Sequence, residues 1–346
     1  GGREIWPPIR GGIAEACRYG TDHFQLETQW RFGAARLTHL IRCGIQPVPL
    51  VHRESLVGAD MGDYLFDTQA KALGANAGLG EGRSLRVALK RTTGKRGRNP
   101  NQTHSAAASL LGQVETRDRV DRLVGEWVPR VQSAMKGATF LSISPAAMRD
   151  YAPQQALEMG ADGRNISAIV KQLCEDPKWK QRIVDWLSEL CAPQIKDITF
   201  VDTDLDDVML QLVEADGTRV SARSLSDGTL RFLGELVALL TAPAGSVLLI
   251  EEIENGLHPQ RLSLLVQLLE GATRDRRIQV IVTTHSPLVL AALSDDTLAN
   301  AVVFARVSDR EGTVARRLGD LPHFHEVAER RGVDDLFAAG WLEQAL

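Results

Sequence analysis

Several features that would assign a chain to a class directly are missing from these 346 residues. No apolar run approaches the ~18 residues that a membrane-spanning helix needs, because Pro243 and Gly245 interrupt the longest candidate. No signal-peptide pattern opens the sequence either. Only four cysteines are present, and their lack of CxxC spacing or a nearby histidine argues for reduced thiols (Cys17, Cys43, Cys174 and Cys191). We therefore expect a soluble cytoplasmic protein without membrane contact.

A strong charge of one sign is missing as well. The 40 basic and 44 acidic residues give a net charge of −4, so no global positive field draws the protein onto nucleic acid. A local basic patch is present in the Gly-rich stretch between residues 74 and 102 (Lys90, Arg91, Lys95, Arg96 and Arg98). This loop either contacts DNA phosphates or is only solvated, and the sequence leaves both interpretations open.

What the chain contains is the composition of a globular protein, with 44% apolar and 24% charged residues. Its length allows one large domain or two ordinary ones. Alternation predicts strands within residues 24–52, and helical spacing predicts a helix within residues 105–137. A strand is expected to end at Pro145, and two further helices are expected within residues 162–191, divided near Asp176-Pro177.

The pattern is clearest after residue 197. Two alternating segments, at residues 197–203 and 206–225, predict strands, and Asp216-Gly217 within the second supplies a hairpin turn. Apolar strands then alternate with helices, and one more hairpin follows (helix 229–240, strand 246–250, helix 259–271, strand 278–284, helix from 287, hairpin 301–318). Continuous apolar strands alternating with helices argue for a parallel sheet that is covered on both faces.

Polar residues gather at three points of this pattern. Glu251 and Glu252 follow one apolar strand, His285 follows the next, and the small-residue loop SLSDGT at 224–229 precedes a helix. In an open α/β sheet, ligands bind beyond the carboxyl ends of the strands, and a helix N-terminus attracts anions. Each point also has a plainer interpretation, as an acidic loop, a structural histidine and an ordinary helix cap.

The order of these three segments along the chain resembles the order of motifs in the ABC-type ATPases of the SMC, RecF and OLD group. LSDGT at 225–229 is similar to the signature loop of that family, and VLLIEE at 247–252 is similar to its Walker B strand. ENGLHP at 254–259 resembles the D-loop of RecF-like and OLD-like members, and TTHSP at 283–287 resembles the switch histidine loop.

The resemblance implies an ABC-type P-loop NTPase head, with a mostly parallel sheet flanked by helices, an antiparallel β portion and a helical insertion. We expect three segments, at residues 1–52, 53–196 and 197–346, the last carrying the ATPase core. The cofactors implied are ATP and Mg²⁺, with Glu251 holding the metal, Glu252 orienting the attacking water and His285 sensing the γ-phosphate. Further nucleotide contacts are implied across a dimer (Ser224, Ser226, Asp227, Gly228, Asn255 and Gly256).

One part of such an ATPase is missing from the sequence. The phosphate-loop pattern GxxxxGK[ST] occurs nowhere. Gly94-Lys95-Arg96 lacks the required Gly and Ser or Thr, since position 89 is Leu, and GLGEG at 78–82 does not complete GxGxxG. Because the loop precedes the recognised segments in the family, we expect it to lie before Gly1. The alternative is a protein without this loop.

The sequence is compatible with two functions. The first is an ATPase that dimerises around ATP and controls a separate effector, plausibly a nuclease or toxin, in antiphage defence or DNA repair. A separate effector is expected because no nuclease motif and no long coiled coil accompany the core in this sequence. The second is an ATP-locked sensor or scaffold that binds nucleic acid or a phage protein with little turnover.

Overall fold

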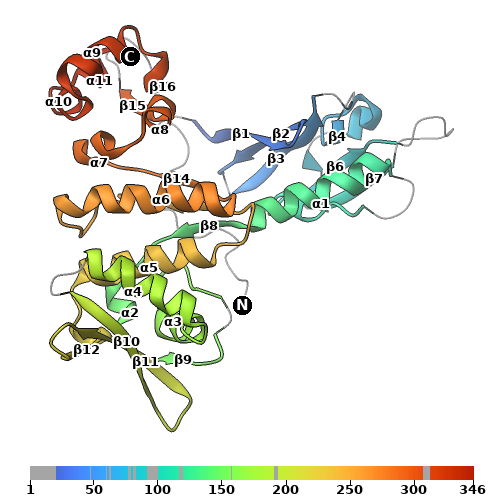
Figure 1. Ribbon diagram of the computed structural model, residues 1–346. Helices are drawn as coiled ribbons and strands as arrows, with labels where there is room; N and C mark the ends of the chain where they lie inside the picture. The colour runs from blue at the N-terminus through green and yellow to red at the C-terminus, as the bar shows by residue number, and fades with distance from the viewer. Residues whose placement is uncertain are drawn as a thin grey trace. The chain divides into compact units, whose positions relative to one another are not determined.

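The computed structural model describes residues 21–46, 48–59, 61, 64–76, 79–80, 83–91, 100–116, 120–156, 158–190, 194–306 and 312–346. The chain divides into two compact units, one ending at Lys136 and the other beginning at Gly137 (Figure 1). Neither unit coincides with any of the three segments expected from the sequence. Within the described residues, no helix is both long and apolar enough to cross a membrane.

The N-terminal unit is built on an antiparallel sheet of seven strands (β1 His23–Phe32, β2 Ala35–Gly44, β3 Leu50–Gly58, β4 Tyr64–Asp67, β5 Leu79–Gly80, β6 Ser84–Leu89 and β7 Asn101–Ser105). It is the largest sheet, so the expectation of a mostly parallel sheet is wrong for the part of the chain described. The short connections between the strands explain why they pair antiparallel. Only Gly33 and Ala34 separate β1 from β2, and a two-residue turn can join only antiparallel strands.

Helix α1 (Arg122–Lys136) belongs to the same unit and is shorter than the helical pattern within residues 105–137 suggests. Its buried residues Val124, Trp127, Val128 and Val131 join the core of the sheet. The described residues of this unit also include the 3₁₀ helices η2 (Lys71–Asn76) and η4 (Leu110–Gly112).

A buried carboxylate anchors η4 to strand β3. Glu54 is fully buried and accepts hydrogen bonds from the backbone N–H groups of Leu110 at 2.6 Å and Leu111 at 2.9 Å. Its Oε1 also accepts from the Ser109 hydroxyl at 2.7 Å and lies 2.9 Å from His39 Nε2. Because burying a carboxylate is costly unless it is hydrogen-bonded, these four contacts make Glu54 acceptable in the core.

Among its described residues, the C-terminal unit contains two sheets with helices between and around them, and a separate two-stranded sheet near its end (Figure 1). The antiparallel sheet confirms the strands and the hairpin turn predicted after residue 197 (β9 Ala152–Pro153, β10 Ile195–Asp202, β11 Asp207–Glu214 and β12 Arg219–Ser221). The other sheet is parallel, in the order β14-β13-β8 (β8 Ala138–Leu141, β13 Val247–Ile250 and β14 Gln279–Val282). Parallel pairing is therefore present, although on a smaller scale than expected.

The helices of this part agree with the sequence pattern. Both helices predicted within residues 162–191 are present, and they divide at the expected place (α3 Ile166–Leu173 and α4 Pro177–Leu190). The helix predicted from Pro259 begins as a 3₁₀ turn and continues past Gly271 (η6 Pro259–Arg261 and α6 Leu262–Arg276). A short helix, a 3₁₀ turn and the main core helix complete the unit's centre (α2 Pro145–Met148, η5 Ala222–Ser224 and α5 Asp227–Thr241).

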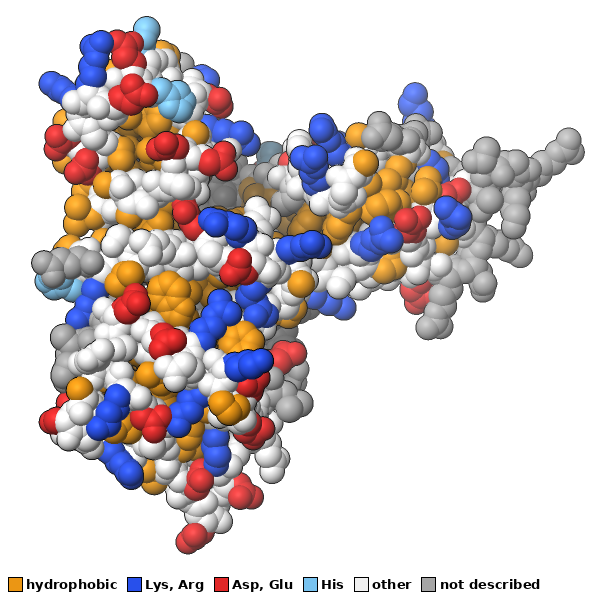
Figure 2. Space-filling view, viewed as in Figure 1, with side chains coloured by type: hydrophobic (Ala, Val, Ile, Leu, Met, Phe, Trp, Pro, Cys, Tyr) orange, Lys and Arg blue, Asp and Glu red, His pale blue; other side chains and the backbone are white. Residues whose placement is uncertain are grey.

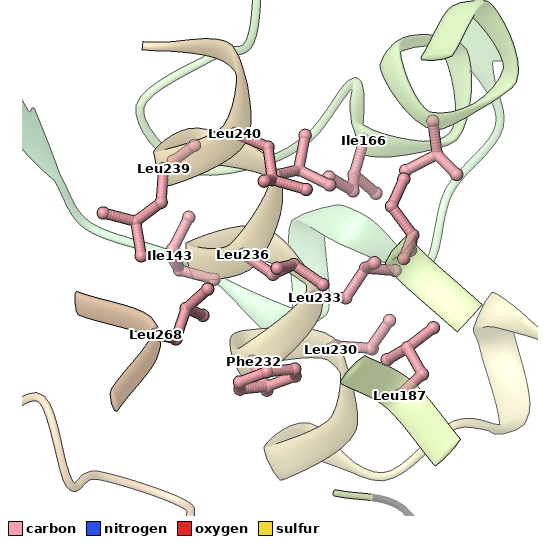
Figure 3. Close-up of a cluster of buried hydrophobic side chains, with 14 of the residues drawn as sticks. Ile143, Ile166, Leu187, Leu230, Phe232, Leu233, Leu236, Leu239, Leu240 and Leu268 are labelled. Atoms are coloured by element: carbon pink, nitrogen blue, oxygen red, sulfur yellow. The ribbon is translucent and has the colours of Figure 1, made fainter. Parts of the chain in front are cut away.

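Helix α5 forms the centre of the core, since its residues from Leu230 to Leu240 are buried except Arg231. Figure 3 shows its Phe232, Leu233 and Leu236 among side chains from several other elements. Those neighbours include Ile166 of α3, Leu187 of α4 and Leu268 of α6. A helix that is apolar on nearly every side is one that the fold surrounds, so the N-terminus of α5 is held firmly in place.

A third hydrophobic cluster organises the C-terminal end (α7 Pro287–Ala292, α8 Asp295–Asn300, β15 Val302–Arg306, β16 Thr313–Arg317, η7 Leu318–Asp320, α9 Phe324–Arg331, α10 Val333–Ala338 and α11 Trp341–Gln344). The strands β15 and β16 pair antiparallel from Val302 opposite Arg317 to Arg306 opposite Thr313, which confirms the predicted hairpin.

One face of the parallel sheet carries exposed apolar side chains in the part of the chain that the structure describes. Leu248 and Ile250 point into the core at 4% exposure, so Leu249 points to the opposite face. There Leu249 pairs with Phe140 on one side and Ile281 on the other. Phe140 and Ile281 are 48% and 47% exposed. Parallel sheets are normally covered on both faces, so this apolar row is a surface on which a further segment can pack.

Candidate active site

The carboxyl ends of β13 and β14 lie side by side, because Ile250 and Val282 are paired in the parallel sheet. The chain therefore brings Glu251-Glu252 and the loop of residues 283–286 to one edge. Two hydrogen bonds join them: Glu252 N donates to Thr283 Oγ1 at 3.0 Å, and Ile253 N donates to the Thr283 carbonyl at 3.2 Å. The parallel pairing thus places the loop after β13 beside the loop after β14.

An unusual backbone conformation shapes the turn of residues 251–256, here called the acidic turn. Glu252 has φ of +47°, in the left-handed region that non-glycine residues rarely adopt. This turn sends Ile253 into the core at 0% exposure while Glu251 and Glu252 stay exposed. The Glu252 carbonyl accepts from Asn255 N at 2.8 Å, which closes the turn. Both carboxylates are thus presented to solvent by a buried anchor.

Glu254 has a role that the sequence did not reveal. Its Oε2 accepts from the Thr284 hydroxyl at 2.7 Å, and its Oε1 accepts from the backbone N–H of His285 at 2.7 Å. The third glutamate of the run therefore fixes the loop that carries the predicted switch histidine. His285 itself is exposed, so its imidazole is available to a ligand.

The predicted signature loop forms the start of α5. Ser226 is the N-cap, and its Oγ accepts from Thr229 N at 3.1 Å. Ser224 is the last residue of the 3₁₀ turn η5, and both serines are exposed. Asp227, in the first turn, forms an ion pair with Arg149 at 2.7 Å. The ordinary helix cap is therefore present, and it leaves this loop open to solvent.

Arg149 is a second residue that sequence reasoning missed. Its guanidinium donates to the carbonyl of Leu225 at 2.8 Å and to that of Arg223 at 3.3 Å, besides contacting Asp227. One side chain from the end of α2 thus holds the whole loop before α5. Its three partners lie more than 70 positions away in the sequence, so no local pattern marks it.

The acidic turn and the start of α5 touch each other. A Cβ on Gly228 would lie 2.3 Å from the carbonyl oxygen of Gly256, a distance that real Cβ atoms essentially never show. Gly256 has φ of +79°, and a Cβ there would lie 3.2 Å from Cδ of Arg231. All three polar points of the sequence are therefore brought together: Gly228 contacts the turn at Gly256, and Glu254 of that turn holds His285.

One buried acid lies below this surface. Burial of Glu235, in the third turn of α5, raises the pKa of its carboxyl to about 8, and the positive charge of Arg231 opposes that rise. Its Oε2 has no hydrogen-bond partner within the described chain. Burial thus favours the neutral form of the Glu235 carboxyl.

The exposed carboxylates suit a hard cation that keeps some of its waters, rather than a cation enclosed in a preformed protein cage. Within the described residues, no group of three or more His, Cys, Asp or Glu side chains gathers to hold a metal. Mg²⁺ does not need such a group, because it commonly takes one or two carboxylates together with waters and substrate phosphates. The exposed carboxylates of Glu251 and Glu252 could supply one or two such ligands.

Other sequence predictions are tested only in part. Lys90 donates to the Met61 carbonyl, whereas Lys95, Arg96 and Arg98 lie outside the described residues, so DNA contact by this loop stays a prediction. Cys43 and Cys174 are free thiols, and burial raises the pKa of Cys174 to about 11. Cys17 and Cys191 lie outside the described part.

One family model matches part of the C-terminal unit. Residues 150–291 match the family model described as "AAA domain, putative AbiEii toxin, Type IV TA system". The matched segment holds every predicted site residue from Ser224 to His285. A search of curated proteins finds no match.

Solved structures that are similar in part come from SMC ATPases. The SMC head bound to the C-winged helix domain of ScpA is 13% identical, with a TM-score of 0.37, over 82% of this chain and 74% of that chain. The SMC head domain from Thermotoga maritima is 10% identical, with a TM-score of 0.31, over the same shares. These TM-scores are too low to carry an argument about the fold. On the family match, residues 150–291 are similar to an AAA-type ATPase domain.

Proposed function

We propose that this protein binds and hydrolyses ATP at the edge formed by β13 and β14. The observation that carries the proposal is the joined pair of loops, in which two exposed carboxylates and an exposed histidine are held together through Thr283 and Glu254. The family match over the same residues supports it. Phosphoryl transfer depends mainly on positioning and on charge stabilisation. This edge offers positioned side chains, and its carboxylates could hold the Mg²⁺ that would supply the positive charge.

Each side chain has a definite task in this proposal. Glu251 holds Mg²⁺, which supplies positive charge to the phosphates when bound. Glu252 orients and polarises the attacking water, and His285 contacts the γ-phosphate. These roles follow the resemblance to ABC-type ATPases, and all three side chains are exposed and so accessible to a ligand.

A second copy of the chain completes the site in this proposal. Ser226 and Gly228, with Ser224 and Asp227 beside them, bind the γ-phosphate held by the partner, and Asn255 and Gly256 lie at the same interface. The contact between Gly228 and Gly256 makes these residues one continuous surface. No GxxxxGK[ST] pattern occurs in residues 1–346, and the open row of Phe140, Leu249 and Ile281 is where a segment carrying a phosphate loop would pack.

We further propose that the ATP-bound dimer acts in the cytoplasm on a separate effector, such as a nuclease or toxin, in antiphage defence or DNA repair. The description of the matched family, which names a toxin of a type IV toxin–antitoxin system, supports a link to such systems. On the face of the C-terminal unit seen in Figure 2, acidic and basic side chains are interspersed. That mixture favours a protein partner over a long stretch of nucleic acid.

The test compares ATP hydrolysis and ATP-dependent association of the wild type with Glu252→Gln and His285→Ala. Glu189→Gln, which changes an exposed glutamate of α4, is the matched control. A hydrolysing switch requires that Glu252→Gln stop turnover while ATP-bound dimers persist, and that His285→Ala also lose turnover. Unchanged hydrolysis in Glu252→Gln contradicts the role of Glu252. ATP-dependent dimers without turnover in the wild type would instead favour the ATP-locked sensor.

A further inference from the structure

Glu254 lies between the two loops of the proposed site and faces protein donors with both oxygens. Oε2 accepts from the Thr284 hydroxyl and Oε1 accepts from His285 N, each at 2.7 Å. Hydrogen bonds to a carboxylate are roughly twice as strong as those between neutral groups. Thr284 Oγ1 in turn accepts from Ser286 N at 3.0 Å, so one carboxylate organises three consecutive residues of the loop.

The same glutamate belongs to the turn that contacts α5. Asn255 and Gly256 follow it directly, and a Cβ on Gly228 would collide with the Gly256 carbonyl. On its other side, Ile253 is fully buried and its N–H is bonded to the Thr283 carbonyl. Glu254 is therefore held by a buried neighbour on one side and by a packed turn on the other, and it cannot move without moving the loop of His285.

We infer that Glu254 is a positioning residue, which fixes His285 relative to the turn at Asn255-Gly256 so that both are in place when a nucleotide binds. This inference rests on the proposed ATPase function for its effect on turnover. A direct role in the reaction is not assigned to Glu254, because both of its oxygens are already engaged by Thr284 and His285. It acts through the loop that it holds.

Replacement by glutamine separates positioning from direct chemistry. In Glu254→Gln, the amide oxygen still accepts from His285 N and the amide nitrogen donates to Thr284 Oγ1, since a hydroxyl both donates and accepts. We expect Glu254→Gln to keep kcat within about 3-fold of the wild type, and Glu254→Ala to lose about 10- to 100-fold in kcat with a smaller change in KM. If Glu254→Gln is as inactive as Glu254→Ala, the carboxylate itself is required and the positioning role is wrong.

A matched control exists elsewhere in the same unit. Glu270 Oε1 accepts from Ser294 N at 3.0 Å and from Ser294 Oγ at 2.7 Å, so Glu270 also ties a loop through one backbone amide and one hydroxyl. Glu270→Ala therefore reproduces the structural loss without touching the loops of Glu252 and His285. We expect it to retain wild-type kcat. An equal loss of kcat in Glu270→Ala would show that general destabilisation explains the result for Glu254→Ala.

Hydrogen exchange tests the inference without relying on turnover. In nucleotide-free protein, the amides of residues 284–286 should exchange at least about 10-fold faster in Glu254→Ala than in the wild type or Glu254→Gln, while Glu270→Ala should affect only peptides around Ser294. Unchanged exchange at residues 284–286 in Glu254→Ala overturns the inference. If the wild type hydrolyses no ATP yet exchange changes as expected, the proposed function fails and the structural role of Glu254 stands.

Discussion

Gly228 packs directly against the backbone of Gly256, so that the start of α5 and the acidic turn share one surface. A Cβ at position 228 would lie 2.3 Å from the Gly256 carbonyl oxygen, and that oxygen belongs to backbone that cannot rotate away. We therefore expect Gly228→Ala to lower the free energy of unfolding by about 1–3 kcal/mol, as overpacking commonly does.

Urea unfolding of Gly228→Ala and Gly271→Ala checks this expectation. Gly271 lies in α6 of the same unit, and a Cβ there would meet nothing within 4 Å. Alanine is preferred over glycine inside a helix, so Gly271→Ala should gain up to ~1 kcal/mol. Equal stability of the two variants would mean that the turn at Gly256 shifts to accommodate the methyl group without loss of stability.

The buried acid Glu235 predicts a pH dependence of stability. Its folded-state pKa of about 8 lies above the ordinary value of 4.5, so the folded protein binds more protons than the unfolded chain between these values. Stability is therefore lost as pH rises from about 4.5 through 8. Glu235→Gln removes the ionisation, and its advantage over the wild type should grow by roughly 3–5 kcal/mol between pH 5 and pH 9.

Urea unfolding at pH 5, 7 and 9 measures that difference, with Glu189→Gln on the surface of α4 as the control. The control should keep a nearly constant offset from the wild type. A constant offset for Glu235→Gln as well would show that Glu235 is ionised in the folded protein and stabilised there by a group such as Arg231.

Ser226 allows the helix cap to be separated from the proposed phosphate contact. Aspartate is as good an N-cap as serine, so Ser226→Asp should keep wild-type stability, whereas Ser226→Ala should lose about 1 kcal/mol. A new carboxylate beside the γ-phosphate of a partner would be repelled, so Ser226→Asp should form no ATP-dependent dimer in sedimentation experiments.

Ser144 offers the comparison, because it caps α2 through its side chain in the same way. Ser144→Asp should associate normally. If Ser226→Asp also associates normally, Ser226 does not face the bound phosphate, and the resemblance of this loop to a signature loop is misleading.

The buried carboxylate of Glu54 predicts a large effect in the N-terminal unit. Glu54→Ala leaves the N–H groups of Leu110 and Leu111 without their acceptor and leaves His39 and Ser109 without their partner. We expect a loss of about 3–5 kcal/mol, the range found when one member of a buried pair is removed.

Proteolysis in urea, with the cleavage sites mapped by mass spectrometry, assigns the loss to the unit that opens. Glu27→Ala, at an exposed position of β1, should leave the cleavage pattern unchanged. A loss below ~1 kcal/mol for Glu54→Ala would show that water replaces the carboxylate without strain.

The local elements after residue 197 follow from the sequence because their signals are local. The helix predicted at 229–240 is α5 at Asp227–Thr241, and the strand predicted at 246–250 is β13 at Val247–Ile250. The N-terminal sheet is different. Strands were expected there, but antiparallel pairing across seven strands depends on connections and register that alternation alone does not encode.

The candidate site, too, could be predicted from the sequence only in part. The proximity of Glu251, Glu252 and His285 follows from strand topology alone. The roles of Glu254 and Arg149 do not, because their partners lie about 30 and 75 positions away and the backbone at Glu252 decides which glutamate points where. The three glutamates of EEIE cannot be told apart in the sequence. The backbone turn exposes the carboxylates of Glu251 and Glu252, whereas the carboxylate of Glu254 holds the loop of His285.

The left-handed backbone of Glu252 also limits which amino acids can ever occupy that position. At φ of +47°, glycine, asparagine and aspartate fit with little strain, whereas β-branched residues such as valine and isoleucine are disfavoured. In a saturation library, folding would therefore remove the β-branched variants before activity is assayed at all. Conformation at position 252 therefore removes some variants before chemistry is tested, so the folded but inactive variants should include glycine, asparagine and glutamine and should lack valine and isoleucine.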